Sequence, residues 1–577
     1  MATLKLIQFS GEIPRVLPRL LPEGAAHRAE NVRLDDGGLT PIRKLRLEHT
    51  FEGMTGIKTI HNHEDEWLAW TTDVDATHGP VAQNRLYYTG DGEPKMRVEG
   101  VEYPLAVPFP TGALTGTTSG TGSGTVITRI YVYTFVTQFG EESEPCPISN
   151  DVNWQAGQTV TLFGFEDAPT GRAIIKQRIY RTQGSASGSE YYLIAERDAS
   201  NANFTDNIAP DEFAEILPSR EWNAPPDGLK GLTAFPNGMM GGFVGKDLYL
   251  CEPYRPHAWP EKYVLTMDFE IVALGSYGTT IVVMTVGQPY IVNGIAPESM
   301  AQEKLELNQP CINARGVVDL GYAVAYPSHD GLVVVSGGQT SIATAALMTR
   351  TEWLKTNPAT FVAGQYNGRY FASYSYLEAD GTPSSGTFIF DLSGQTPFVL
   401  RGTAKADACW YDIEGSQLYM LMGNQVYEWD AFGQINEVMT WLSKEFVLAA
   451  PASFGCIYID SQRQRTPEQQ AAIDAEIEAI KARNAATFAA GSMGGDLNGS
   501  AINVHQVNGD DLTRLSPQSF IVVSVYADGA LICTVSTANQ VVRIPAVRAR
   551  RWEVRVNGTL EVAEIALAST ARELNTV

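Results

Sequence analysis

The sequence predicts a mainly β protein with three parts: a β-propeller-like body, an inserted β-sandwich of the immunoglobulin or fibronectin type III kind, and one short helical insertion. Three observations predict this fold class. Hairpins recur from about residue 228 to 460, alternating strands cluster between 107 and 220, and one strong helix signal follows residue 461. The 53 Gly, 31 Pro and 10% aromatic residues favour β-structure with many turns. A chain of 577 residues exceeds one core, so we expect roughly two to four domains.

The hairpins of the body are predicted from short turn sequences between apolar runs. Asn-Gly, Asp-Gly and Gly-Asn pairs supply the positive φ that two-residue hairpin loops need. Successive turns lie about 37 to 56 residues apart, which is the period of a four-stranded propeller blade. The predicted turns are Gly287-Gln288, His329-Asp330-Gly331, Asn367-Gly368 and Gly423-Asn424. Trp429-Asp430 matches the closing dipeptide of WD repeats, but without a Gly-His partner upstream we interpret it as a coincidence.

The N-terminal segment is predicted to lie extended over other structure. Pro14, Pro18 and Pro22 recur at four-residue intervals, and proline at that density disfavours both a long helix and an inner strand. We expect a short helical turn near Ala25–Glu30. Two readings are equally open: the arm wraps its own domain, or it docks on a neighbouring subunit.

The next segment predicts hairpins like those of the body, and its first turn contains potential metal ligands. A strand through His61 and His63 would point both imidazoles to one face, close to Glu64, Asp65 and Glu66. No further ligands follow at a fixed spacing, so a solvated turn is favoured over a metal site.

A Gly/Ser/Thr-rich stretch, TGALTGTTSGTGSGT at 111–125, is predicted to be a linker or long loop. It lacks the Gly-Lys-Ser/Thr ending of a phosphate-binding loop, so nucleotide binding is not supported. The alternating strands after it fit the β-sandwich. Its first hairpin carries Glu141, Glu142 and Glu144. Paired carboxylates occur in glycosidases, but three glutamates in one hairpin loop favour a solvated tip.

The strongest helix is predicted to begin after residue 465. Thr466 can cap it, Pro467 fits the first helical position, and Gln469 completes a capping box. The apolar positions form a narrow stripe that either packs on the same chain or pairs with a copy of itself. These positions are Ile473, Ile477 and Ile480.

The C-terminal part predicts further hairpins, with turns at Asp528-Gly529 and Asn557-Gly558. It also holds the one basic cluster of the chain. A rim of structural ion pairs is the favoured role in this acidic protein, and contact with nucleic acid is the alternative. The cluster consists of Arg548, Arg550, Arg551 and Arg555.

Composition excludes several classes of protein. The net charge of −23 argues against a protein that grips DNA through its phosphates. No apolar run approaches the ~20 residues that span a membrane, and the N-terminus lacks the apolar core of a signal peptide. Because the cysteines are widely spaced, we expect buried free thiols and folding in a reducing cytoplasm. The six are Cys146, Cys251, Cys311, Cys409, Cys456 and Cys533.

Four stretches of the chain resemble the tail nozzle proteins (tail tubular protein B type) of short-tailed bacteriophages. They are FSGEIPRVLPRLLPEGAAHRAENVRLDDGGLTPIRK, NRLYYTGDGEPK, TWLSKEFVLAAPASFGCIYID and RIPAVRARRWEVRVNGTLEVAEIALASTAREL. The resemblance implies a hexameric ring below the portal and adaptor, with a propeller body around a DNA channel and contacts to tail fibres or spikes. It implies no catalytic residue, metal or cofactor, and it places the protein in the virion tail after assembly in the host cytoplasm.

The domain organisation that we expect combines both lines of argument. It comprises an extended docking arm (1–56), first propeller hairpins (57–106), the inserted sandwich (107–220), the propeller body (221–460), the helical insertion (461–500) and C-terminal strands that close the body (501–577).

Two other functions remain open at this point. A propeller-type glycoside hydrolase acting on host surface polysaccharide would need two carboxylates in one pocket. A receptor-binding tail fibre would be trimeric, and the absence of fibrous repeats argues against it. The nozzle is therefore the expected function, with DNA passing through the lumen without specific binding.

Overall fold

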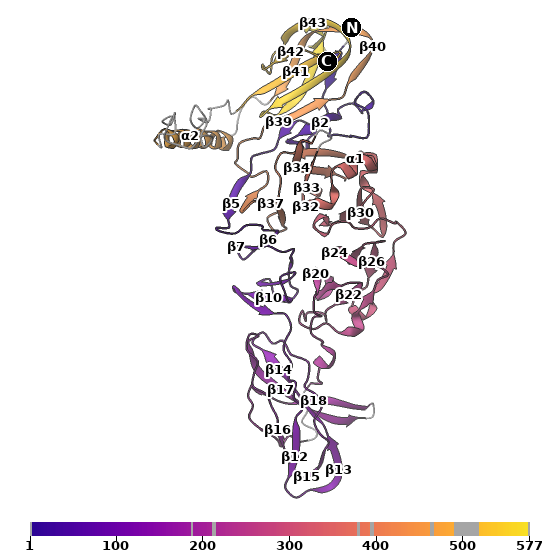
Figure 1. Cartoon of the computed structure of the whole chain (residues 1–577), viewed down its shortest axis with the longest axis vertical. Helices are drawn as coiled ribbons and strands as arrows, with labels where there is room; N and C mark the ends of the chain where they lie inside the picture. The colour runs from indigo at the N-terminus through magenta and orange to yellow at the C-terminus, as the bar shows by residue number, and fades with distance from the viewer. Residues whose placement is uncertain are drawn as a thin grey trace. The chain divides into compact units, whose positions relative to one another are not determined.

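The computed structural model describes residues 3–185, 188–209, 215–377, 381–392, 397–461, 467–489 and 519–574. It confirms the predicted fold class: the chain is mainly β, with a propeller-like series of small sheets, an inserted sandwich and a helical insertion (Figure 1). The helix of this insertion has 23 residues and is longer than predicted. The chain divides into two compact units. The sandwich unit comprises Lys58–Val324 and Val335–Ser341, and the terminal unit comprises Met1–Ile57, Ala325–Val334 and Ile342–Val577.

Four-stranded antiparallel sheets follow one another along the propeller-like body. They are preceded by the hairpin of β6 (Thr59–His63) and β7 (Glu66–Trp70). The first sheet contains β8 (Asp75–His78), β9 (Arg85–Thr89), β10 (Lys95–Val98) and β11 (Val101–Pro104). The second contains β20 (Lys230–Phe235), β21 (Met239–Val244), β22 (Asp247–Leu250) and β23 (Leu265–Thr266). The third contains β24 (Ile271–Tyr277), β25 (Thr280–Thr285), β26 (Tyr290–Asn293) and β27 (Ala301–Lys304). The fourth contains β28 (Val318–Asp319), β29 (Val324–Pro327), β30 (Leu332–Ser336) and β31 (Gln339–Ile342).

Two of the predicted hairpin turns of the body, Asn367-Gly368 and Gly423-Asn424, are confirmed as tight turns with positive φ. Asn367 and Gly368 both have positive φ, at 52° and 69°, and they join two strands whose last pair is Tyr366 and Arg369. Gly423 likewise has positive φ between Met422 and its partner Gln425. Turn chemistry therefore located these hairpins correctly.

The inserted sandwich is built from three small sheets in the sandwich unit. Their orders are β12-β16-β19, β13-β15 and β14-β17-β18. The strands are β12 (Thr115–Ser119), β13 (Ser123–Arg129), β14 (Tyr131–Thr137), β15 (Val152–Ala156), β16 (Thr159–Phe163), β17 (Ile174–Ser185), β18 (Gly188–Asp198) and β19 (Phe204–Asp206). Their inward residues form one apolar core, which includes Tyr131, Tyr133, Phe135, Trp154 and Leu162.

The prediction of a linker or long loop at 111–125 is wrong. This stretch forms β12 and the beginning of β13, which pair with β16 and β15. Gly120 and Gly124 adopt positive φ, at 94° and 81°, where the chain turns and where the register shifts. The backbone of this stretch is held by partner strands that supply the core, so its lack of large side chains does not prevent a strand.

A twelve-stranded sheet dominates the terminal unit. Its order is β1-β44-β40-β43-β39-β2-β35-β34-β33-β32, with β41 paired to β43 and β42 paired to β41. The strands are β1 (Thr3–Leu6), β2 (Ala26–Glu30), β32 (Val362–Tyr366), β33 (Arg369–Leu377), β34 (Pro383–Asp391), β35 (Phe398–Gly402), β39 (Met439–Ser443), β40 (Phe446–Ser461), β41 (Ile521–Ala527), β42 (Ala530–Val535), β43 (Val542–Gly558) and β44 (Val562–Ala568).

The N-terminal segment forms strands within the sheets of its own terminal unit. The helical turn predicted near Ala25–Glu30 is wrong, because Ala26–Glu30 is strand β2 between β39 and β35. The Ala29 amide donates to Glu12 Oε1 at 2.9 Å, and the small alanine side chains are fully buried in that narrow position. Docking of this segment on a neighbouring subunit stays a prediction.

A further strand from the N-terminal segment completes the last propeller-like sheet. β5 (Arg46–Thr50) pairs with β38 (Gln425–Glu428), next to β37 (Gln417–Met422) and β36 (Ala408–Asp412). The small sheet of β3 (Val32–Arg33) and β4 (Thr40–Pro41) precedes β5.

Three α-helices are present among the described residues: α1 (Arg350–Lys355), α2 (Pro467–Ala489) and α3 (Ala571–Leu574). α2 begins at Pro467, as predicted, whereas its predicted cap, Thr466, lies outside the described residues. The side chain of Gln469 is also outside them. Within the predicted stripe, Ile473 and Ile480 are buried and Ile477 is half-buried.

One predicted C-terminal turn is confirmed and the other is wrong. Asp528-Gly529 joins β41 to β42. Asn557-Gly558 forms the last two residues of β43 instead, where Asn557 pairs with Val522 on one side and Thr440 on the other. Because both edges of β43 are paired here, the ladder keeps this Asn-Gly pair extended.

Candidate functional site

The two glutamates of the sandwich hairpin are buried, so the prediction of a solvated tip is wrong for them. Glu141 is 5% and Glu142 is 3% exposed. The hairpin itself forms as predicted, since backbone hydrogen bonds link Thr137 to Glu141 and Phe135 to Ser143. Consecutive residues of an extended chain point to opposite faces, so the two carboxylates reach different partners.

Glu142 is bound within the sandwich. Its carboxylate accepts hydrogen bonds from Thr134 Oγ1 at 2.8 Å and Tyr180 OH at 2.6 Å. Its third partner is Arg178, whose Nη1 lies 3.0 Å from Glu142 Oε2. Burial, reinforced by Glu142, raises the pKa of Tyr180. A carboxylate held by one cation and two hydroxyls stabilises the ladder between β14 and β17.

Glu141 joins the sandwich hairpin to the first sheet of the body in the same unit. Arg172 Nη2 donates to Glu141 Oε2 at 2.6 Å, and Thr137 Oγ1 donates to the same atom at 3.2 Å. Arg85 of β9 lies 3.6 Å from Glu141 Oε1 and covers the Phe139 ring. Arg172 is 1% exposed, and its Nε and Nη1 atoms have no hydrogen-bond partner among the described residues.

A histidine of the body closes this junction, which we name the hairpin junction (Arg85, Glu141, Glu142, Arg172 and His257). His257 Nε2 lies 3.2 Å from the carbonyl oxygen of Glu142. A carbonyl only accepts, so Nε2 carries the proton in this arrangement. Burial lowers the pKa of His257 to about 4.

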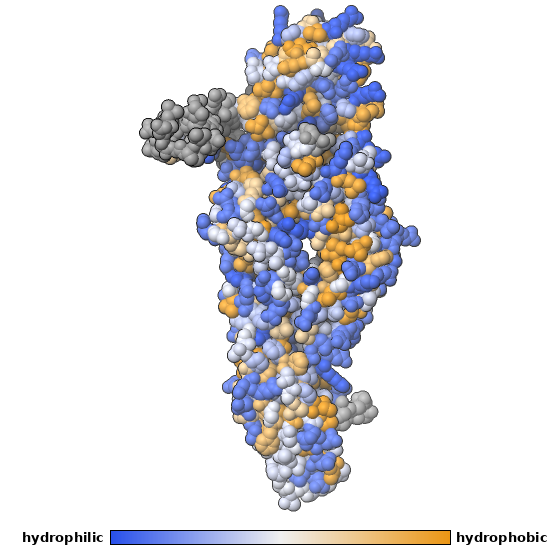
Figure 2. Space-filling model, viewed as in Figure 1, coloured by the Kyte–Doolittle hydropathy of each residue, from blue (hydrophilic) through white to orange (hydrophobic). Residues whose placement is uncertain are grey.

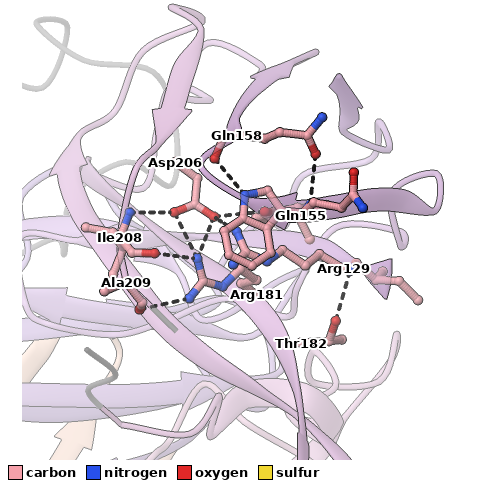
Figure 3. A network of polar contacts seen from close by, with 11 residues as sticks. Arg129, Gln155, Gln158, Arg181, Thr182, Asp206, Ile208 and Ala209 are labelled. Atoms are coloured by element: carbon pink, nitrogen blue, oxygen red, sulfur yellow. Dashed lines mark hydrogen bonds and ion pairs between the residues drawn. The ribbon is translucent and has the colours of Figure 1, made fainter. Parts of the chain in front are cut away.

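A second buried ionic network links the three sheets of the sandwich (Figure 3). The Asp206 carboxylate on β19 accepts from Arg181 Nη1 at 2.7 Å and from Tyr131 OH at 2.8 Å. Arg129 Nη1 lies 3.4 Å from the same carboxylate. The Arg129 guanidinium stacks on the Trp154 ring at 3.6 Å. Buried charges of this kind are stable only when paired and hydrogen-bonded, so this network is a structural connection between sheets.

Sequence reasoning missed both networks. In the sequence, Arg172 lies 31 residues from Glu141, and Arg178 lies 36 residues from Glu142. His257 lies 115 residues from Glu142. A weak signal was present in the alternation of Arg178 and Tyr180 on a strand, since both reach Glu142.

His61 and His63 lie on β6 and are buried, so they are not part of a solvated turn. The turn is at Glu64 and Asp65, which have positive φ and exposed side chains. The rings of His61 and His63 lie 5.5 Å and 5.3 Å from the ring of His78 on β8. Burial lowers the pKa of His61 to about 3 and also lowers that of His63. Within the described ranges, no group of three or more His, Cys, Asp or Glu residues could hold a metal ion.

Among the described residues, the predicted rim of ion pairs on β43 is correct for Arg551 alone. Arg551 lies 3.4 Å from Glu445. Arg548 and Arg550 donate through Nε to the carbonyl oxygens of Pro451 and Leu448 instead. Contact of these arginines with nucleic acid stays a prediction.

Asp430, interpreted above as part of a coincidental WD match, anchors the N-terminal segment. It is buried in the terminal unit and lies 2.9 Å from Arg33 and 3.2 Å from Arg43. The Arg43 amide also donates to Asp430 Oδ1 at 2.7 Å. This carboxylate therefore fixes β3 and β4 against the last propeller-like sheet.

All six cysteines are free, and four of them are buried, which confirms the predicted free thiols. Burial raises the pKa of Cys251 and of Cys311 to about 12. In the part of the chain that the structure describes, no helix is both long and apolar enough to cross a bilayer.

Comparison with known proteins gives no relative by sequence. No family model matches the chain, and no curated protein matches it.

Among solved structures, the extracellular domain of a hybrid two-component system protein from B. thetaiotaomicron has a TM-score of 0.27 and 6% identity. That match covers 73% of this chain and 43% of the other. The N-terminal domain of Nup159 has a TM-score of 0.22 and 7% identity, covering 45% of this chain and 67% of the other. An exo-β-1,3-galactanase from Phanerochaete chrysosporium has a TM-score of 0.21 and 9% identity, covering 78% of this chain and 100% of the other. At these TM-scores, none of the three matches indicates a shared fold or function.

Proposed function

We propose that this chain is a structural component of a bacteriophage tail: a nozzle ring that forms the DNA channel below the portal and adaptor. In this role it retains the genome, conducts it during ejection and supports tail fibres or spikes. The proposal needs no cofactor and no catalytic residue. Its site of action is the virion tail, after assembly in the host cytoplasm.

One observation carries the proposal. Three of the four stretches that resemble tail nozzle proteins, taken from both ends and the middle of the chain, lie side by side in one sheet. The N-terminal stretch supplies β2, the stretch from Thr440 supplies β39 and β40, and the C-terminal stretch supplies β43 and β44. The sheet order places them together as β44-β40-β43-β39-β2. These three stretches therefore share one sheet of the terminal unit.

The charged residues of the sandwich unit support a structural role. Glu141, Glu142 and Asp206 are buried and each is bound by at least one arginine. A carboxylate that is bound by an arginine and buried away from solvent is poorly placed for acid–base work on a polysaccharide. The net charge of −23 per chain suits a channel in which carboxylates repel phosphates over the roughly 8 Å of physiological screening.

Assembly of the purified full-length chain and of the virion tests the proposal. We expect negative-stain electron microscopy to show a six-fold ring, and mass photometry to show a species of six times the 62.9 kDa chain mass. A chain that is a stable monomer within virions would reject the nozzle. Release of reducing sugar from host surface polysaccharide by the pure protein would favour the glycoside hydrolase instead.

A further inference from the structure

The outward side of β43 is a row of exposed arginines on an otherwise acidic chain. Ala549, Trp552 and Val554 are buried on the inward side of the strand. The residues that face away from that core are Arg548, Arg550, Arg551 and Arg555, all of them exposed. Residues 542–558 contain five arginines and one glutamate, whereas the whole chain has a net charge of −23. We name these four exposed residues the arginine row.

Two of these arginines are held in place by the neighbouring strand. Arg548 Nε lies 3.4 Å from the carbonyl oxygen of Pro451, and Arg550 Nε lies 3.0 Å from that of Leu448. Among the described residues, each guanidinium uses Nε alone, so its two terminal nitrogens can bind another partner. A guanidinium already fixed along a strand loses less conformational entropy when it binds a carboxylate than a free side chain does.

A groove on the same face continues from the arginine row. Its volume is about 390 Å³. The residues that line it come from β2, β39, β41, β43 and the β41–β42 turn, and Arg555 belongs to both the row and the groove. They are Arg28, Thr440, Leu442, Tyr526, Gly529, Glu553 and Arg555. The groove therefore adds apolar and aromatic contacts to the positive charge.

The mixture of side chains favours an acidic protein surface over DNA. Val447 on β40, which pairs with Arg551, is 46% exposed on the same face as the arginines. Exposed apolar residues and arginine together are typical of protein–protein interfaces, whereas a phosphate backbone offers valines nothing to bind. An acidic protein surface is available on every copy of this chain, since the rest of it carries the excess of carboxylates.

We propose that the arginine row and its groove bind the acidic surface of a second copy of this chain. The inference rests on the proposed nozzle ring, because it assigns the face that joins one subunit to the next. Arginine–carboxylate pairs at the rim steer the two copies together, and Leu442 and Tyr526 of the groove exclude water from the contact.

Charge reversal in the full-length chain tests this face. The double variant Arg548→Glu/Arg550→Glu is compared with Arg220→Glu, a change at an exposed arginine of the sandwich unit. Assembly is followed by mass photometry across a concentration series at low and high salt. We expect the double variant to weaken self-association at least tenfold, and the control to leave it unchanged. Thermal unfolding checks that each variant is folded.

The outcomes separate this inference from the proposed function. A six-fold ring that forms equally well in the double variant overturns the inference and leaves the nozzle standing. Failure of the wild-type chain to associate with itself, alone or in virions, overturns both. Labelled duplex DNA serves as a second probe, measured by fluorescence anisotropy. Binding that the double variant abolishes without any change in self-association would assign the arginine row to nucleic acid instead.

Discussion

The hairpin junction and the arginine row are both short runs of like charge on a β-strand or hairpin, yet one is buried and the other exposed. Glu141 and Glu142 are covered on both sides, by Arg178 of the sandwich and by Arg85 and His257 of the body. Among the described residues, the guanidinium groups of Arg548 and Arg550 bind only backbone carbonyl oxygens of β40. The difference shows that a charged run becomes internal when tertiary neighbours of opposite charge cover it, and not because of its own composition.

Removal of a buried carboxylate should give the largest effect. Glu141→Ala leaves Arg172, which is 1% exposed, without its ionic partner. We expect the free energy of unfolding of the sandwich unit to fall by about 3–5 kcal/mol. Urea unfolding followed by tryptophan fluorescence measures it.

The matched control is Asp268→Ala, which breaks the exposed pair between Asp268 and Lys304. It should leave the unfolding midpoint almost unchanged, because exposed ion pairs are screened by solvent. Similar midpoints for Glu141→Ala and the control would mean that the hairpin junction is hydrated, and the contrast with the arginine row would disappear.

Substitution within the Asp206 network should have a somewhat smaller effect. Asp206→Asn keeps one oxygen acceptor for Arg181 and Tyr131 but removes the charge between two buried arginines. We expect a loss of about 2–3 kcal/mol, with Asp151→Asn at an exposed position of the sandwich as the control. A variant more stable than the wild type would show that burial of these charges costs more free energy than their ion pairs and hydrogen bonds recover.

Acid should destabilise the sandwich unit through its buried histidines. The pKa of His61 is lowered to about 3 and that of His257 to about 4, both chiefly by burial. The unfolded chain binds these protons near pH 6.5, so stability is full above that pH and is lost as the pH falls toward 4. At pH 5, each of these two histidines should lower the free energy of unfolding by about 2 kcal/mol relative to its value above pH 6.5.

Unfolding midpoints at pH 7.5 and pH 5 measure this effect. His257→Gln should reduce the difference between the two midpoints, even if it lowers both of them. An unchanged difference would show that His257 is protonated in the folded chain, and the hairpin junction would then be more open than its exposure indicates.

Truncation in the arginine row should have the smallest effect on stability. Arg548→Ala and Arg550→Ala remove exposed side chains that bind backbone carbonyls, so we expect changes within about 0.5 kcal/mol. Thermal unfolding of the full-length chain measures them. A loss comparable to that of Glu141→Ala would mean that these arginines hold β40 to β43 rather than facing a partner.

Local turn chemistry made much of the fold predictable from the sequence. Asn367-Gly368 and Asp528-Gly529 supply positive φ between alternating strands, and both are hairpins. The same signal failed at Asn557-Gly558, where strands on both sides hold the backbone extended. The preference of an Asn-Gly pair for a turn is weak compared with the hydrogen bonds from strands paired on both sides of it.

The candidate sites were less predictable, because burial depends on distant residues. The spacing of His61 and His63 correctly predicted a shared strand, but their burial beside His78 depends on how β6 meets β8. Likewise, nothing near Glu141 in the sequence indicates that Arg172 lies at 2.6 Å. Such contacts follow from topology, which a single sequence specifies only indirectly.

The pairing of β5 with β38 has a consequence for the order of folding. The strands that complete the last propeller-like sheet lie far apart in the chain, and Arg46 faces Glu428 across it. During synthesis, β5 leaves the ribosome long before its partner exists and stays unpaired until then. Contacts of such high sequence separation form late, so a chaperone that shields this early strand from aggregation would act before the last sheet closes.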